Sequence, residues 1–434
     1  DEALPKENNE LLKHEIDRGS TVYNVRLDAS TLHGIDVTDA EKPGETGVSL
    51  TTLEDVHNLL DGLDLAKYPF MMYTGESALA PLAMVAAAVK AQGKDVSALH
   101  GVIGGSPLTQ LLTDGKNKES LEKAYDQMAE TIRWARKNAP SVATVFITSD
   151  VFSLGGAQAV QEIAYTFGVA VEYVREMLKR GISIHDIAQS FYFGFNVGAT
   201  FFIEIAKLRA ARQVWSNIMK AFGAEEDRSM KIHAKPAFFT KTIFDVGVNM
   251  LRNTTEAFSA VVGGVDTYEN APYDDTVRKG DEFSRRIARN LQIMLQEEFG
   301  MLRPIDAAGG SWAIEKLTKE MAEKIWAEFQ KIESLGGMTK AIEEGYPQKE
   351  IKAVLEKRFK ALDLRKDRAV GNNMYPLMGE VLLEARPEDT KAIQKELGDA
   401  AKAYRADLDL AFRSQKLAEL KDAGEGEAID KAAA

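Results

Sequence analysis

The chain has 434 residues, is 45% hydrophobic and carries a formal net charge of −12 with both signs interspersed. This charge excludes the basic face that nucleic-acid binding requires, and the absence of cysteine excludes disulfides and thiolate chemistry. No apolar run reaches the roughly 18–20 residues of a membrane span, and Asp1 to Glu15 lacks the apolar stretch of a signal peptide. We therefore expect a cytoplasmic protein with a large core.

Strand-like and helix-like segments alternate along most of the chain. Strands are expected where aromatic and β-branched residues gather, at 21–28, 69–73, 98–103, 143–148, 191–200, 230–234, 265–268 and 302–306. Helical patterns follow them, at 52–62, 77–91, 118–138, 157–179, 201 onward, 243–261, 283–299 and 313–332. Eight such units are what a (β/α)8 barrel requires, so we predict an α/β fold of the TIM-barrel type.

The segments outside the predicted barrel are polar or amphipathic. Residues 1–19 are expected to form an N-terminal arm or a short helix, and residues 20–335 the barrel. Residues 336–422 should form a C-terminal helical extension, with helices at 339–344, 348–361 and 388–421. Residues 423–434 should be a flexible tail.

Functional groups of such barrels lie just past the C-terminal ends of the strands. Of the six histidines, His33 and His233 occupy such places. For His233 a place at the barrel mouth and a gap-filling role weigh equally, whereas for His33 a solvated loop is favoured. The pairs Gly104-Gly105 and Gly155-Gly156 could admit a phosphate, but tight turns explain them as well.

The remaining polar candidates at strand ends are Thr74-Gly75-Glu76, Ser149-Asp150, Glu269-Asn270 and the pair Asp274-Asp275. We interpret Asp274-Asp275 as a helix start rather than as an acid–base couple. The sequence has no phosphate-binding loop, dinucleotide fingerprint or metal-spaced cluster of ligands, so we expect no metal site.

Three stretches carry a specific likeness. Residues 201–212 read FFIEIAKLRAAR, residues 282–290 read EFSRRIARN, and residues 334–343 read SLGGMTKAIE. They resemble the methylmalonyl-CoA mutase family of adenosylcobalamin-dependent acyl-CoA mutases, and the resemblance runs in order over residues 18–380. It implies a barrel whose axis is the channel for a CoA thioester, with cobalamin docked on its C-terminal face.

The chain departs from the family at the strand ends. Val151 replaces a histidine that polarises the thioester carbonyl, and it can neither donate a hydrogen bond nor transfer a proton. Leu154 replaces a glutamate close to the corrin. Asp114 stands where an arginine pairs with the substrate carboxylate, which it would repel. Ser190 and Tyr192 replace an arginine and a serine, which suggests a filled channel.

Some candidate contacts remain. His233 is kept, and it would be the catalytic residue if the chain is active. The candidate substrate contacts are Thr267, Tyr192 and Lys235, and the candidate cofactor contacts are Asp275 and Asn249.

The resemblance implies a silent partner subunit, because polar contacts are lost while the scaffold is kept. We expect the non-catalytic small subunit of a heterodimeric mutase, supporting a catalytic large subunit. Adenosylcobalamin would then belong to the assembled complex and not to this chain alone. Two alternatives are an active acyl-CoA mutase of altered specificity, using a cobalamin domain on a separate chain, and an interaction protein on the same barrel that does not use cobalamin.

Overall fold

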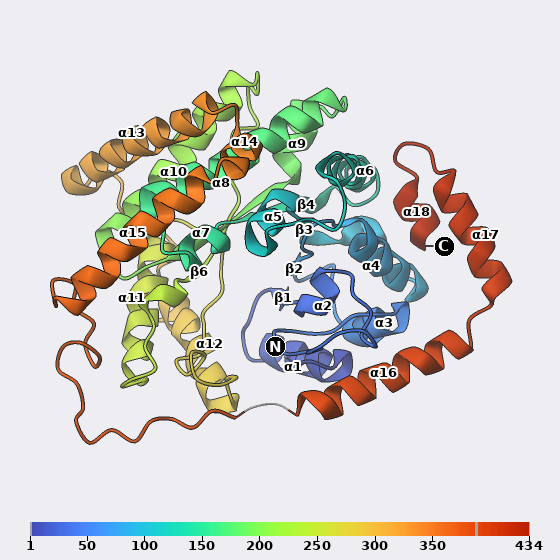
Figure 1. The fold of residues 1–434 in the computed structure, drawn as a ribbon, viewed down its shortest axis with the longest axis horizontal. Helices are drawn as coiled ribbons and strands as arrows, with labels where there is room; N and C mark the ends of the chain where they lie inside the picture. Colours follow the sequence, from blue (N-terminus) through green and yellow to red (C-terminus); the bar gives the residue numbers. More distant parts are fainter. Residues whose placement is uncertain (1, 387–388, 434) are drawn as a thin grey trace. The chain divides into compact units, whose positions relative to one another are not determined.

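A computed structural model describes residues 2–386 and 389–433 of the chain (Figure 1). Within them the chain has the predicted α/β fold of the TIM-barrel type with a C-terminal helical extension. The strands follow one another in sequence order: β1 (Tyr23–Val25), β2 (Phe70–Tyr73), β3 (His100–Gly105), β4 (Ser141–Thr148), β5 (Phe191–Val197), β6 (Ile232–Pro236) and β7 (Thr267–Tyr268). The strand pairs β1–β2, β2–β3, β3–β4, β5–β6 and β6–β7 are parallel, because helical crossovers connect successive strands.

The chain divides into two compact units. Unit 1 comprises Asp1–Phe146, Val174–Tyr192 and Glu388–Ala434, and unit 2 comprises Ile147–Tyr173 and Phe193–Pro387. The helices of unit 1 are α1 (Pro5–Asp17), α2 (Ala29–Leu32), α3 (Leu53–Leu60), α4 (Leu79–Ala91), α5 (Pro107–Asp114), α6 (Leu121–Asn138), α9 (Ile184–Ser190), α16 (Thr390–Ala406), α17 (Leu410–Lys421) and α18 (Ala428–Ala433). Those of unit 2 are α7 (Asp150–Leu154), α10 (Phe201–Ala221), α11 (Val248–Val262), α12 (Glu282–Glu297), α13 (Trp312–Ser334), α14 (Met338–Glu343) and α15 (Tyr346–Asp363), and α8 (Ala159–Lys179) begins in unit 2 and ends in unit 1.

Unit 1 buries both faces of its strands. Along β2, Phe70 and Met72 join the large apolar cluster that contains the buried side chains of α3 and α4. Met71 belongs to a separate apolar cluster with Val102 of β3. Since successive side chains of a strand point to opposite faces, the second cluster lies on the face turned away from the helices.

Unit 2 has an aromatic core. The ring of Phe193 on β5 lies 4.8 Å from that of Trp215 on α10 and 6.2 Å from that of Phe167 on α8. Trp215 reaches this core because α10 buries a stripe of side chains at helical spacing, which includes Ala211 and Ile218. The helix predicted after residue 201 is therefore confirmed.

The predicted eighth strand is wrong. Residues 302–306 form turns, and Leu302 and Ile305 are 69% and 98% exposed. A half-buried strand needs apolar and polar residues that alternate over several positions. The two apolar residues of this stretch do not alternate in this way, so it has no apolar face to bury against the sheet.

The C-terminal helices differ from the expectation in two places. The predicted helix 388–421 is divided between α16 and α17, because Asp409 accepts hydrogen bonds from the backbone N–H of Ala411 and Phe412 and so starts a new helix. Its first residue, 388, lies outside the described residues. We expected residues 423–434 to be a flexible tail, but residues 428–433 form α18, which packs on α4 and α6 and fully buries Ile429. No helix in the described ranges is long and apolar enough to cross a membrane.

Candidate functional site

Polar side chains tie together the C-terminal ends of three strands in unit 2. Asp150 follows β4, Asn196 lies in β5, and Lys235 lies in β6, directly opposite Asn196 in the strand register. The Asp150 carboxylate accepts a hydrogen bond from Lys235 Nζ at 2.7 Å and another from Asn196 Nδ2 at 2.9 Å. Both carboxylate oxygens are thus engaged by this chain's own side chains.

The ion pair keeps Asp150 charged. Burial would raise the pKa of its carboxyl, but the charge of Lys235 and the hydrogen bonds from Lys235, Asn196 and Thr148 outweigh burial, so the pKa is lowered. A carboxylate with a lowered pKa and two engaged oxygens is a poor proton acceptor. The predicted substrate contact Lys235 therefore forms a cross-link between strand ends.

A second ionic cluster is joined to this cross-link through Asn196. Lys207 of α10 is 1% exposed and lies 3.0 Å from Glu162 of α8, and it also pairs with Glu204. The other Glu162 oxygen accepts from Ser149 Oγ at 2.6 Å and from the Asn196 backbone N–H at 2.9 Å. Burial lowers the pKa of Lys207, but the two carboxylates outweigh it and raise the pKa, so the ammonium is retained.

The predicted catalytic residue His233 is buried beside the predicted substrate contact Thr267. The strand register pairs the two residues, and His233 Nδ1 lies 2.9 Å from Thr267 Oγ1. His233 Nε2 lies 3.7 Å from a carboxylate oxygen of Glu269. Only 7% of His233 is exposed. The structure thus brings His233 and Thr267, two candidates from neighbouring strands, together in a buried hydrogen-bonded cluster.

The turn after β4 offers no proton donor at the position that the resemblance marks. Val151 is half-buried in α7, and Leu154 at the end of α7 is 58% exposed. Gly156 has φ +99°, and a Cβ there would lie 2.6 Å from Leu355 of α15. Arg358 of α15 donates to the Gly156 carbonyl at 3.0 Å. Gly156 therefore allows the close approach of α15.

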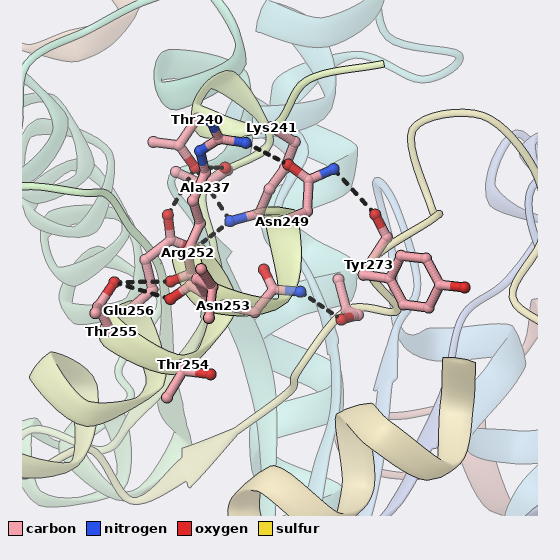
Figure 2. Close-up of polar contacts among 12 residues, drawn as sticks. Ala237, Thr240, Lys241, Asn249, Arg252, Asn253, Thr254, Thr255, Glu256 and Tyr273 are labelled. Carbon is pink, nitrogen blue, oxygen red and sulfur yellow. Dashed lines mark hydrogen bonds and ion pairs between the residues drawn. The ribbon is translucent and has the colours of Figure 1, made fainter. Parts of the chain in front are cut away.

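Figure 2 shows how the predicted cofactor contact Asn249 is used. Its Nδ2 donates to the carbonyls of Thr242 and Tyr273 at 2.9 and 3.0 Å, and its Oδ1 accepts from the Thr242 backbone N–H and from Arg252. Asn249 is fully buried, and it holds the segment after β6 against the segment after β7. The other predicted cofactor contact, Asp275, is exposed in the turn that follows Tyr273.

A buried ion pair stands beside Asn249 in the same view (Figure 2). Lys241 is bonded to Glu256, and Glu256 also accepts from Thr240 Oγ1 at 2.7 Å. Burial lowers the pKa of Lys241 and raises that of Glu256, and each effect exceeds the opposing influence of the partner. We interpret this pair as an anchor for the loop, because both side chains are almost completely enclosed.

In unit 1, the predicted substrate contact Tyr192 packs among apolar side chains. It is 7% exposed and belongs to the cluster with Met71, Val102 and Ala143. Its ring meets that of Phe146 edge to face, with the centroids 5.9 Å apart. This is the strand face turned away from the helices, so the aromatic replacement fills space there.

The structure unites His33 and Asp114, which the sequence treated separately. His33 Nε2 lies 2.7 Å from Asp114 Oδ2, and Gln110 Nε2 also donates to this oxygen. The Gln110 Oε1 accepts from Tyr73 OH at 3.3 Å. His33 lies in the turn after α2 with its side chain 36% exposed, so it remains open to solvent while it contacts Asp114. Sequence reasoning missed Gln110, although Pro107 and Gly115 mark the start and end of its helix.

Comparisons with known proteins agree on one family. The family profile described as "Methylmalonyl-CoA mutase" matches residues 1–434. The chain is 33% identical over 427 residues to a methylmalonyl-CoA mutase of Cereibacter sphaeroides, which covers 96% of this chain and 60% of that protein. It is 30% identical over 412 residues to the Escherichia coli methylmalonyl-CoA mutase, with 94% and 58% coverage. A methylmalonyl-CoA mutase large subunit of Propionibacterium freudenreichii is 29% identical over 412 residues, with 94% and 57% coverage. The chain thus spans about three fifths of the length of these relatives.

Proposed function

This chain belongs to the methylmalonyl-CoA mutase family, and from that premise we propose that it is the non-catalytic small subunit of an acyl-CoA mutase. In this role it supports a catalytic large subunit, which binds the acyl-CoA and carries out the isomerisation. The complex is then a heterodimer in which this chain keeps the barrel scaffold without its chemistry.

The strongest support comes from Tyr192. Its ring packs against Phe146 within an enclosed apolar cluster. An open channel for a CoA thioester needs space along this face of the strands, and the packed rings of Tyr192 and Phe146 occupy space there. Val151 adds to the argument, since its side chain has no group that could polarise a carbonyl.

Two positions that the resemblance places near adenosylcobalamin, Asn249 and Leu154, carry side chains that do not fit a cofactor contact. The Asn249 amide nitrogen donates to two backbone carbonyls of this chain, and its amide oxygen accepts from Arg252. Leu154 presents an exposed apolar side chain in place of a carboxylate. We therefore derive no step through the cofactor, and we assign it to the large subunit or to a separate cobalamin-binding chain.

Native mass spectrometry tests the partnership. This chain is mixed at micromolar concentration with a catalytic large mutase subunit from the same organism. A heterodimer is expected, and the absence of any heteromer would contradict the proposal.

An ultraviolet–visible titration with hydroxocobalamin tests the silence of the chain. No spectral change is expected for the chain alone. Cobalamin binding together with acyl-CoA turnover, by this chain and an isolated cobalamin domain, would overturn the proposal.

A second candidate function is an active acyl-CoA mutase of altered specificity that uses a cobalamin domain on another chain. The cluster of His233 with Thr267 favours it, because an imidazole beside a hydroxyl is a possible acid–base group. In an isomerase assay with the separate cobalamin domain, this second function predicts that the wild-type chain converts acyl-CoA and that the His233→Ala variant does not. Under the small-subunit proposal, neither the wild-type chain nor the variant shows any conversion.

A further inference from the structure

We propose that the corner of unit 1 formed by His33, Gln110 and Tyr73 is a carboxylate-binding site, which the chain fills with its own Asp114. Removing the Asp114 side chain would leave the donors in place, and a small free monocarboxylate such as formate or acetate would take its position. The proposal stands on the local geometry of unit 1 and needs no partner, cofactor or CoA.

Both ring nitrogens of His33 lie beside oxygen acceptors. Its Nδ1 lies 2.6 Å from the Ala29 carbonyl oxygen, which can only accept, so Nδ1 carries a hydrogen. Its Nε2 lies 2.7 Å from Asp114 Oδ2, and an ionised carboxylate likewise only accepts. His33 Nε2 also lies 3.2 Å from Gln110 Nε2, so the imidazole, the amide and the Asp114 carboxylate meet at one point.

Gln110 is the second donor, and its amide cannot turn round without losing a contact. Tyr73 OH donates to Oε1 at 3.3 Å, which turns Nε2 toward Asp114 Oδ2. The Gln110 side chain is enclosed, with 5% of the residue exposed. A buried amide and an imidazole therefore converge on one carboxylate oxygen.

The donors come from separate elements that are held close together. His33 follows α2, Tyr73 ends β2, and Gln110 lies on α5. Gly75 permits the approach, because a Cβ there would lie 2.7 Å from the Leu32 carbonyl oxygen and 3.5 Å from Gln110 Oε1. Backbone packing thus brings the elements that carry the donors close together.

Solvent reaches both Asp114 and His33, whose side chains are 23% and 36% exposed. Asp114 reaches the site from α5, one helical turn after Gln110. The other charged groups nearby are used elsewhere: Lys118 Nζ donates to the Gly34 carbonyl at 3.0 Å, and Glu76 accepts the backbone N–H groups of Lys118 and Glu119. Truncation at Asp114 would open a path to the donors without releasing another internal anion.

The test compares Asp114→Ala with Asp114→Asn in the full chain. Thermal unfolding is followed while sodium formate or acetate is added, with sodium chloride at matched ionic strength. We expect formate and acetate to raise the melting temperature of Asp114→Ala along a saturating curve. The wild-type chain and Asp114→Asn should show only the response to salt, since their side chains still occupy the site.

A second substitution identifies the donors. In the Asp114→Ala background, His33→Ala and Gln110→Ala should each abolish the saturating response. If Asp114→Ala does not fold, Asp114→Ser replaces it. A truncated variant that responds to carboxylates no more than the wild-type chain would overturn the proposal. That result would leave the heterodimer test unaffected, because no partner is present in this experiment.

Discussion

At the scale of single residues, Lys207 places a fully buried positive charge in unit 2. Its ammonium is enclosed between Glu162 and Glu204 and also bonds the Asn196 carbonyl. A buried charge is tolerated only when it is paired and hydrogen-bonded, so removing one member leaves the others exposed to a large desolvation penalty.

Lys207→Met should therefore lower the free energy of unfolding by about 3–5 kcal/mol, because two buried carboxylates lose their counter-ion. Urea unfolding followed by tryptophan fluorescence measures the change. Lys220→Met is the matched control, since Lys220 is exposed on the same helix and should change stability by less than about 0.5 kcal/mol. Equal effects of the two substitutions would show that the buried network contributes little.

The Asp150–Lys235 cross-link should give stability that depends on acid. Because the folded-state pKa of Asp150 is lowered, its contribution is present above the unfolded-state value of about 3.9 and is lost as the pH falls through the folded-state value. Asp150→Asn should cost about 1–3 kcal/mol at pH 7. The difference from the wild-type chain should shrink below about pH 4.

Urea unfolding at a series of pH values measures this difference. Asp399→Asn, at an exposed position of α16, serves as the control and should differ little from the wild-type chain at any pH. A wild-type advantage over Asp150→Asn that persists unchanged into acid would contradict the assignment.

The site residues differ in how far the sequence could reveal them. His233 is the second residue of β6 and Thr267 the first of β7, and the register of two parallel strands brings these positions side by side. The contact of His33 with Asp114 joins residues 81 positions apart, across a loop and a short helix that the sequence pattern did not reveal. Long-range pairs of this kind depend on tertiary packing, which local periodicity does not encode.

At the scale of elements, α18 shows how one apolar residue can dock a short helix. The helix is only six residues long, too short to be stable alone. Its Ile429 enters the apolar cluster that includes Leu82 and Trp134, and Lys90 of α4 pairs with Asp430 at 3.0 Å.

Ile429→Ala should lower the stability of unit 1 by about 2–5 kcal/mol, because a buried aliphatic side chain is lost and a cavity remains. Thermal unfolding gives the measurement. Leu417→Ala on α17 is the control, since Leu417 is 44% exposed and buries less area. If the two variants melt at the same temperature, α18 is not anchored as described.

The elements that the sequence predicted correctly have strong periodicity or long apolar runs, as α10 and β4 do. The failures have weak local signals. Residues 302–306 contain apolar residues but no strand alternation, and the tail around Ile429 is dominated by charged and small residues. In both cases the outcome was decided by whether a partner surface was available.

At the scale of the whole molecule, each unit has a core of its own. The Phe167–Phe193–Trp215 core lies in unit 2, and the cluster around Leu82 and Ile429 lies in unit 1. Local openings should then be confined to the unit in which a core is weakened.

Hydrogen exchange measured by mass spectrometry tests this expectation. Lys207→Met should speed exchange in peptides from α10 and β5 and leave α4 unchanged. Ile429→Ala should speed exchange in α4 and leave α10 unchanged. Acceleration that spreads through both units in either variant would mean that the chain opens as a single cooperative body.

The chain changes units inside β4, α8 and β5, between residues 146 and 147, 173 and 174, and 192 and 193. Neither unit therefore corresponds to one uninterrupted stretch of its gene. A recombination event that exchanged, split or duplicated one unit alone would have to cut within strands of the sheet. We therefore expect the two units to be inherited together. Viable gene fusions or breaks should fall outside residues 23–268, the span from β1 to β7.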